Sequence, residues 1–175
     1  MNYATIKWTD IANGEGVRIS LFVSGCTRRC KNCFNAVAWD FAYGEPFDEV
    51  VQERILKGLE ADYISGLTLL GGEPLEPQNQ RALLPFVREV KKRVPQKTIW
   101  CYTGNVFDPA TGLLKEADKN TEVTEKLISL FDVLVDGEFI EAQKNIRLKF
   151  RGSSNQRVLD VKKSKISKSP VFYLD

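Results

Sequence analysis

Three of the four cysteines lie close together in the sequence, where their thiols could bind one metal centre. Cys26, Cys30 and Cys33 form a CxxxCxxC motif, and Cys101 follows much later in the chain. This spacing allows a [4Fe–4S] cluster with three local ligands and one open iron, or a structural zinc site completed by Cys101. It also allows a thioredoxin-like pair at Cys30 and Cys33, which leaves Cys26 unexplained. The spacing favours the iron–sulfur cluster.

Charged residues inside the same loop could compensate the negative charge of such a cluster. Arg28, Arg29 and Lys31 stand between the cysteines, and cations near a metal centre offset the charge of its thiolate ligands. The alternative is that these side chains only solvate a surface turn.

The remaining composition excludes several familiar kinds of catalysis. The chain has 175 residues, a net charge of +2 and no histidine. The missing histidine excludes Ser-His-Asp and Cys-His catalysis, HExxH zinc chemistry and His-ligated haem. The near-neutral charge argues against a dedicated nucleic-acid binder. The N-terminus lacks the features of a secretory signal, and no apolar run approaches the roughly 18 residues of a transmembrane helix. We therefore expect a cytoplasmic protein without disulfides that does not bind membranes.

Alternating strand and helix patterns provide the elements that must position the cysteine loop. Period-two or short apolar runs predict strands at 17–23, 67–70, 98–102, 133–135 and 158–161. Helical spacing predicts a helix over about 48–60 with Asp48 as its N-cap, and another that begins at Thr121. A third apolar stripe spans 83–90, with Pro85 in its first turn or at a kink. Residues 105–120 are expected to be irregular.

This alternation predicts an α/β fold with a parallel sheet, in which successive strands end at one edge. Several strands end in a glycine or polar signal, namely Gly25, Gly71-Gly72, Thr103-Gly104 and Asp136-Gly137. Ligands of parallel α/β folds bind at such carboxyl ends. No repeat or linker is visible, so we expect a single domain over 1–175, with a basic Lys/Ser tail at 162–170.

A second motif, Gly71-Gly72-Glu73-Pro74, directly follows one of the predicted strands. Two glycines let the backbone approach a ligand closely, and a carboxylate beside exposed carbonyls suits an ammonium group. Taken alone, the motif could also be only a tight strand-to-helix turn.

The CxxxCxxC motif after a first strand, followed by Gly-Gly-Glu-Pro, resembles the radical S-adenosylmethionine (SAM) enzymes. Four further stretches resemble the activating proteins of anaerobic ribonucleotide reductases within that superfamily: Cys33-Phe34-Asn35, Tyr102-Thr103-Gly104, Val135-Asp136-Gly137 and the segment 151–156. The resemblance covers about residues 10–161. It implies an incomplete (β/α) barrel of the radical SAM type, built on a parallel sheet.

The resemblance also implies a set of cofactor contacts. Cys26, Cys30 and Cys33 would bind the [4Fe–4S] cluster, whose open iron would chelate SAM. The segment Gly71, Gly72 and Glu73 would hold the ammonium group of SAM. Thr103 and Asp136, at later strand ends, are weaker candidates for SAM contact.

One position departs from the superfamily pattern. Many radical SAM proteins have an aromatic residue just before the last cysteine of the motif, where it lies beside the adenine. Here Asn32 holds that position and the aromatic residue is Phe34. We therefore assign the adenine contact to the segment Asn32, Cys33 and Phe34.

The implied function is that of an oxidoreductase that cleaves SAM reductively and generates a glycyl radical on anaerobic ribonucleotide reductase. Its partners would be that reductase and a low-potential electron donor, without direct binding of nucleic acid. The alternatives are an activase of another glycyl-radical enzyme or another small radical SAM enzyme. A third, non-enzymatic alternative is an iron–sulfur electron-transfer or zinc-stabilised binding module.

Several residues are expected to have only structural roles. Cys101 lies within a predicted strand and is expected to pack in the core. Trp8, Trp39 and Trp100 are expected to pack in the core or at the rim. The lysines of the tail are expected to be solvated, and a docking role for them is the less favoured alternative.

Overall fold

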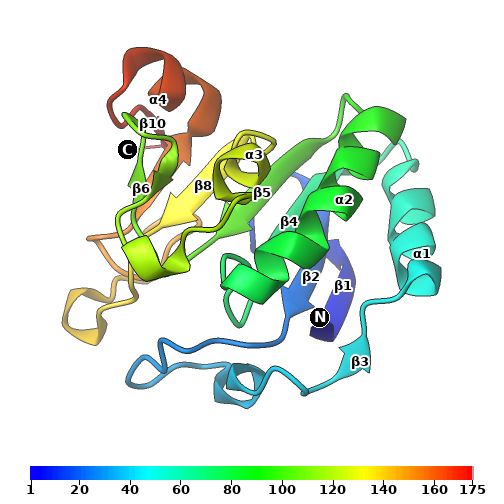
Figure 1. Cartoon of the computed structure of the whole chain (residues 1–175), viewed down its shortest axis with the longest axis horizontal. Coiled ribbons are helices and arrows are strands. Elements are labelled where there is room, and N and C mark those ends of the chain that lie inside the picture. Colours follow the sequence, from blue (N-terminus) through cyan, green and yellow to red (C-terminus); the bar gives the residue numbers. More distant parts are fainter. Residues whose placement is uncertain (175) are drawn as a thin grey trace.

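The computed structural model describes residues 1–174, and a curved eight-stranded sheet forms its centre (Figure 1). The order of the strands is β10-β9-β8-β5-β4-β2-β1-β3. The four central strands are parallel: β2 (Val17–Val23), β4 (Ile64–Gly71), β5 (Thr98–Tyr102) and β8 (Val133–Asp136). This arrangement confirms the predicted α/β class and the largely parallel sheet of an incomplete barrel.

Antiparallel strands extend the parallel block on both sides. β1 (Asn2–Asp10) and β3 (Glu45–Pro46) lie beyond β2, and β9 (Arg157–Asp160) and β10 (Phe172–Leu174) lie beyond β8. The prediction of a parallel strand near 158–161 was therefore wrong in direction. The carboxyl ends of β2, β4, β5 and β8 still meet at one edge of the sheet.

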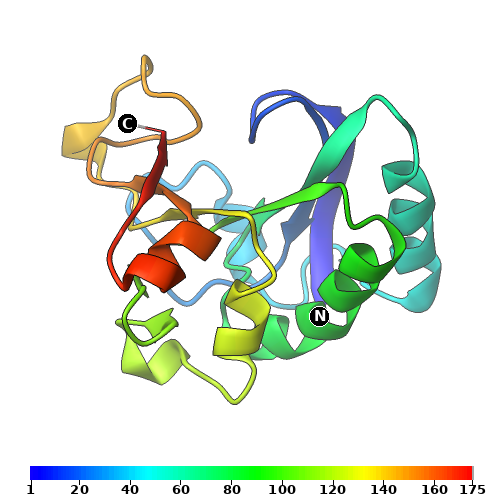
Figure 2. The same ribbon diagram turned by 90° about the horizontal axis from the view of Figure 1, so that it is seen from above.

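Four helices cover the outer face of the sheet (Figure 2). They are α1 (Glu49–Leu59), α2 (Pro77–Arg93), α3 (Thr124–Ile128) and α4 (Val161–Ser167). The main core lies between these helices and the sheet. As predicted, Asp48 caps α1, because its carboxylate accepts a hydrogen bond of 3.0 Å from the Val51 N–H. No helix in residues 1–174 is long and apolar enough to span a membrane.

Two predicted helices have different bounds in the structure. α2 begins at Pro77, where a proline suits the first helical position, and it continues through Pro85. Pro85 therefore lies in the middle of the helix, on its exposed side, instead of in its first turn. α3 begins at Thr124 instead of Thr121, because the Thr121 N–H bonds to the Thr124 hydroxyl at 2.7 Å just before the helix.

The ends of the chain contain more structure than the sequence pattern predicted. β1 was missed because it lies near the edge of the sheet, next to the two-residue strand β3, where it is mostly half-exposed or exposed and shows no clean apolar alternation. The basic tail holds α4, which Asp160 caps through the Lys163 N–H, and it ends in β10. Lys162, Lys163 and Lys168 are nevertheless exposed, as expected.

The excursion at 105–120 is also partly regular. It contains a two-stranded hairpin of β6 (Phe107–Asp108) and β7 (Leu113–Leu114), followed by the 3-10 helix Ala117–Lys119. Two further 3-10 helices, Ala36–Trp39 and Glu141–Gln143, lie in the loops after β2 and β8.

A smaller core lies on the inner face of the sheet, around Trp100 and Val133. Arg18 is buried there, and its guanidinium donates hydrogen bonds to the Thr68 hydroxyl at 2.7 Å and to two backbone carbonyls of neighbouring strands at 2.8 Å. It also lies 5.5 Å from the centre of the Trp100 ring. These contacts close the interior of the incomplete barrel below the edge at which the cysteine loop lies.

Candidate active site

The three clustered cysteines follow β2 and line one cavity at the carboxyl edge of the parallel strands. Cys26, Cys30 and Cys33 are free, half-buried thiols. All three contribute to a cavity of about 540 Å³ that also reaches Gly71, Gly72 and Glu73. The structure thus brings the two sequence motifs together, although one follows β2 and the other follows β4.

The cysteine loop reverses direction sharply between its thiols. Arg29 and Asn32 have positive φ angles of 50° and 59°, in the left-handed region that side chains other than glycine seldom adopt. The Cys33 N–H bonds to the Cys30 carbonyl at 3.2 Å. These turns keep the three thiols on a single compact loop.

Buried polar contacts anchor the first half of this loop. Glu76 is buried and accepts hydrogen bonds from the Thr27 N–H at 2.8 Å and the Thr27 hydroxyl at 2.6 Å, while Lys119 pairs with it at 3.0 Å. Arg28 donates to Asn105 at 2.7 Å and lies 3.4 Å from the carboxylate of Glu138. Sequence reasoning missed these anchors. Only the position of Glu76 just after the Gly-Gly-Glu-Pro motif could have pointed to one of them.

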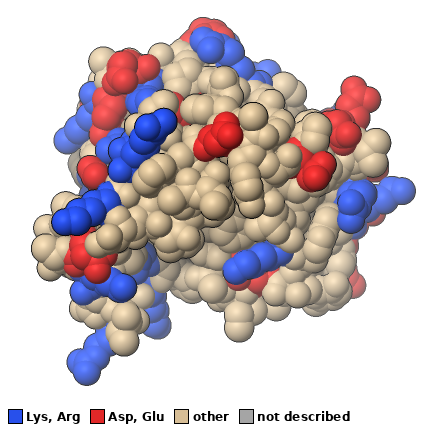
Figure 3. Space-filling model, turned by 90° about the horizontal axis from the view of Figure 1, so that it is seen from below, with Lys and Arg blue, Asp and Glu red and all other residues tan. Residues whose placement is uncertain are grey.

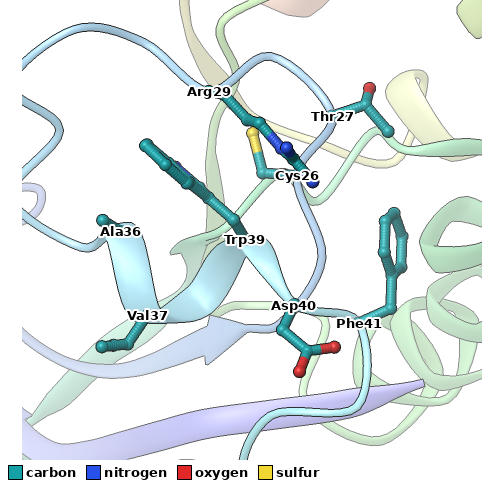
Figure 4. Close-up of a pocket in the computed structure, with 8 residues that line it drawn as sticks. All are labelled: Cys26, Thr27, Arg29, Ala36, Val37, Trp39, Asp40 and Phe41. Carbon is teal, nitrogen blue, oxygen red and sulfur yellow. The ribbon is translucent and has the colours of Figure 1, made fainter.

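Of the loop cations predicted to compensate the charge of the cluster, one already pairs with other side chains and two are exposed. The guanidinium of Arg28 is already engaged by Asn105, Glu138 and Glu116, the last at 3.6 Å. Arg29 and Lys31 are exposed. In Figure 4 the Arg29 side chain extends from the same turn as the Cys26 thiol, in a second cavity of about 760 Å³ that also includes Trp39.

The two glycines of the second motif are required by the close approach of the cysteine loop. The Gly72 N–H bonds to the Val23 carbonyl and the Glu73 N–H to the Gly25 carbonyl, each at 2.8 Å. Gly71 has a φ of +113°. A Cβ at Gly72 would lie 2.6 Å from the Gly25 carbonyl oxygen and 2.8 Å from that of Ala38. The motif therefore continues the pairing of β2 and β4 beyond the strands.

The carboxylate of Glu73 braces this edge of the sheet. It is buried and accepts hydrogen bonds at 2.8 Å from the Leu75 N–H, the Thr103 hydroxyl and the Gly104 N–H. Burial raises the pKa of Glu73, and the three hydrogen bonds and Arg28 oppose that effect. The end of β5 is thereby tied to the end of β4, which places the predicted contact residue Thr103 beside Glu73.

The other predicted SAM contacts lie in two different places. Asn32 and Phe34 line the cavity of the cysteines, and Phe34 is 91% exposed. Asp136 lines a separate cavity of about 380 Å³. Its buried carboxylate pairs with Arg157 and accepts a hydrogen bond of 2.8 Å from the Phe107 N–H. The cysteines do not line this separate cavity, although Arg28 of their loop does.

Cys101 lies on the other face of the sheet from the three clustered thiols. It is fully buried in the core under the helices, whereas its neighbours Trp100 and Tyr102 pack on the inner face, as strand alternation requires. Burial raises the pKa of the Cys101 thiol well above its usual range. Cys101 is therefore a core residue, as predicted, and it is not placed to complete a four-thiolate zinc site.

The three thiols line one cavity, where each could bind a different iron of a multi-iron cluster. Within residues 1–174, no three His, Cys, Asp or Glu side chains converge closely enough to hold one metal ion. A cubane cluster does not require such convergence, because each thiolate binds a different iron atom. Burial raises the pKa of Cys26, and burial with Glu138 raises that of Cys30 to about 11. Metal binding would therefore release protons from these thiols.

The cavity also contains a polar group that the sequence did not reveal. Tyr102 lines it, and its hydroxyl is buried without a hydrogen-bond partner among residues 1–174. Trp100 is buried and Trp8 is 37% exposed, which agrees with the expected core and rim packing, whereas Trp39 lines the cavity beside the cysteines. The Arg151 side chain holds its own loop, because its guanidinium donates to the Gln156 carbonyl at 2.8 Å.

Comparisons with known proteins agree with this geometry. The model of a 4Fe-4S single cluster domain matches residues 12–159. The chain is 45% identical over 158 residues to the anaerobic ribonucleoside-triphosphate reductase-activating protein of Haemophilus influenzae, which covers 89% of this chain and 96% of that protein. The protein of the same name from Pasteurella multocida is 44% identical over 89% of this chain and 95% of its own length.

A more distant relative shows the same pattern. The Escherichia coli protein of that name is 37% identical over 160 residues, or 90% of this chain and 97% of its own length. The matches thus span nearly the whole of each protein, and the family model covers both motifs that line the cavity. The chain belongs to the family of anaerobic ribonucleoside-triphosphate reductase-activating proteins, which is built on a single-cluster 4Fe–4S domain of the radical SAM type.

Proposed function

We propose that this chain generates a glycyl radical on an anaerobic ribonucleoside-triphosphate reductase, with a [4Fe–4S] cluster and SAM as cofactors. When bound, these cofactors supply the one-electron chemistry that removes a hydrogen atom from a glycine of the partner. The observation that carries the proposal is the single cavity at the strand ends, which contains all three motif cysteines and the Gly-Gly-Glu segment.

Cys26, Cys30 and Cys33 are the proposed cluster ligands. Their loop is turned twice by left-handed residues, and hydrogen bonds from Thr27 and Arg28 anchor its first half, which supports a loop shaped to present its thiols to one cluster. Three thiolates leave one iron of a four-iron cluster without a protein ligand. The position of Cys101 in the opposite core supports this division into three ligands and one core thiol.

The proposed SAM contacts are of two kinds. Gly71 and Gly72 bring backbone close to the cysteine loop, and Glu73 holds that backbone in place through its three hydrogen bonds. Asn32 and Phe34 line the same cavity from the cysteine loop, where an exposed ring is available to stack on an adenine. Thr103 acts through Glu73, as a positioning residue.

The chain's residues also account for access by a protein substrate. The cavity is open to solvent and is lined by the loop that connects β8 to β9. A glycine on a flexible loop of the reductase could enter it from outside. Hydrogen-atom transfer needs no general base, which suits a site without histidine. The proposal includes a low-potential electron donor and a reducing compartment, the cytoplasm, in which the thiols stay free.

The test is anaerobic reconstitution with a reductase of the glycyl-radical type. The reconstituted chain, a chemical reductant, SAM and the reductase should give 5′-deoxyadenosine, methionine and the EPR doublet of a glycyl radical on the reductase. A brown protein that cleaves SAM but never forms that radical would favour a different radical SAM activity. A colourless zinc protein without SAM cleavage would overturn the proposal.

A further inference from the structure

A projecting loop at the mouth of the cavity carries four cations and two carboxylates, a net charge of +2. We call residues 138–151, between β8 and β9, the basic flap. In Figures 1 and 2 this orange segment extends away from the rest of the molecule. Its base is held by hydrogen bonds from the Asn145 N–H to the Gly152 carbonyl at 3.1 Å and from the Ser154 N–H to the Gln143 carbonyl at 3.0 Å. The flap is therefore an ordered projection with a fixed base.

The cations of the flap all follow its two carboxylates, Glu138 and Glu141, in the sequence. The stretch 144–151 contains four cations and no carboxylate: Lys144, Arg147, Lys149 and Arg151. Lys144, Arg147 and Lys149 are exposed, and none of them pairs with a carboxylate within the described part of the chain. Ile146, in the same stretch, is 92% exposed. Figure 3 shows Lys and Arg side chains projecting from the corresponding lobe at its lower left.

The flap is also part of the wall of the cysteine cavity. Phe139, Lys144, Ile146 and Leu148 line that cavity together with the three cysteines. At the base of the flap, Glu138 lies 3.4 Å from Arg28 of the cysteine loop. A molecule held by the flap is therefore held next to the thiols.

We propose that the basic flap is the docking surface for an acidic segment of the reductase, next to the glycine that enters the cavity. This inference rests on the proposed function. Unpaired exposed cations attract an acidic protein surface and speed its encounter, and an exposed isoleucine among them offers an apolar anchor. SAM is not the occupant that these cations suit, because its sulfonium group is itself positive.

The lysines of the C-terminal segment are the competing basic surface. Lys162 and Lys163 belong to α4, which lies on the helix-covered face of the sheet, and neither lines the cysteine cavity (Figure 2). Reversing their charge changes the net charge of the chain by the same amount as reversing two flap residues. They therefore provide a matched control.

The experiment compares Arg147→Glu/Lys149→Glu with Lys162→Glu/Lys163→Glu, both as the cluster-loaded protein. Neither pair lines the cavity, so SAM cleavage without the reductase should be unchanged in both variants. Direct binding to the reductase should weaken at least tenfold in the flap variant, about 1.4 kcal/mol, and stay within about twofold in the control. Added salt should weaken binding of the wild type more than that of the flap variant.

A third variant, Ile146→Ser, tests the apolar anchor and should weaken binding without changing its salt dependence. Any of three results would overturn the docking surface. The wild type and the flap variant could bind equally well, both charge variants could lose the same affinity, or the wild type could fail to bind. Because binding is measured separately from radical formation, a wild type that binds the reductase but forms no glycyl radical would refute the proposed function alone.

Discussion

Glu73→Gln is expected to destabilise the protein even when no SAM is present. The carboxylate accepts three hydrogen bonds of 2.8 Å, from the Leu75 N–H, the Thr103 hydroxyl and the Gly104 N–H. An amide of the same shape has only one acceptor oxygen. If that oxygen keeps the bonds from Leu75 and Thr103, the amide NH₂ faces the Gly104 N–H, so two donors meet.

The magnitude follows from the bond that is lost. A hydrogen bond to a charged group contributes about 1.5–3 kcal/mol, and a buried donor left without a partner costs about 1–3 kcal/mol. Burial raises the pKa of Glu73, which shows that the buried charge is itself unfavourable, and a neutral amide removes that cost. We therefore expect a net loss of about 2 kcal/mol in the free energy of unfolding.

The assay is thermal unfolding of the cluster-loaded protein without SAM, under anaerobic conditions. A loss of about 2 kcal/mol corresponds to a Tm lower by about 4–8 °C for a chain of this size. Thr103→Ser keeps the hydroxyl that bonds to Glu73 and should lower the Tm by much less. If Glu73→Gln left the Tm unchanged and weakened only SAM binding, the carboxylate would be a ligand and the bracing role would be refuted.

Three further substitutions test other parts of the site by the same unfolding assay. Gly72→Ala places a Cβ 2.6 Å from a backbone carbonyl of the cysteine loop and should cost about 1–3 kcal/mol. Gly58→Ala in α1 places a Cβ 2.7 Å from the terminal methyl of Ile19, which can shift more easily than a backbone carbonyl, and it gains helix propensity, so it should cost less; equal effects would contradict this steric argument. Tyr102→Phe removes a buried hydroxyl that has no partner and should raise stability by about 1 kcal/mol; a lower Tm would reveal a partner for that hydroxyl. Arg157→Ala leaves the buried Asp136 carboxylate unpaired and should lower the free energy of unfolding by about 3 kcal/mol. Adding Asp136→Asn should recover part of this loss; no recovery would show that the pair contributes mainly through packing.

The sequence could predict the central part of the fold because its strands are buried and carry at least one apolar face. β2 and β5 have the predicted bounds, since buried parallel strands appear as continuous or alternating apolar runs. β1 and β10 could not be predicted in the same way, because strands at or next to the edge of the sheet bury little surface. The direction of β9 depends on long-range pairing with β8, which no local pattern records.

The candidate site shows a similar division. The cysteine and glycine motifs could be recognised because their residue types and spacing are themselves chemical signals. The role of Glu73 as a brace could not, because it depends on Thr103 and Gly104 at the end of a different strand. Asp136 looked equivalent to Thr103 in the sequence, since both end a parallel strand. Only the structure shows that Asp136 pairs with Arg157 away from the cysteines.

The most direct test of the account is the iron and sulfide content of the four single cysteine-to-serine variants. Cys26→Ser, Cys30→Ser and Cys33→Ser should each lose the cluster or its ability to cleave SAM. Cys101→Ser should keep about four irons per chain, as expected for a [4Fe–4S] cluster, and its reduced EPR signal should still change on addition of SAM. If Cys101→Ser lost iron to the same extent as the other three, the division into three ligands and one core thiol would be contradicted.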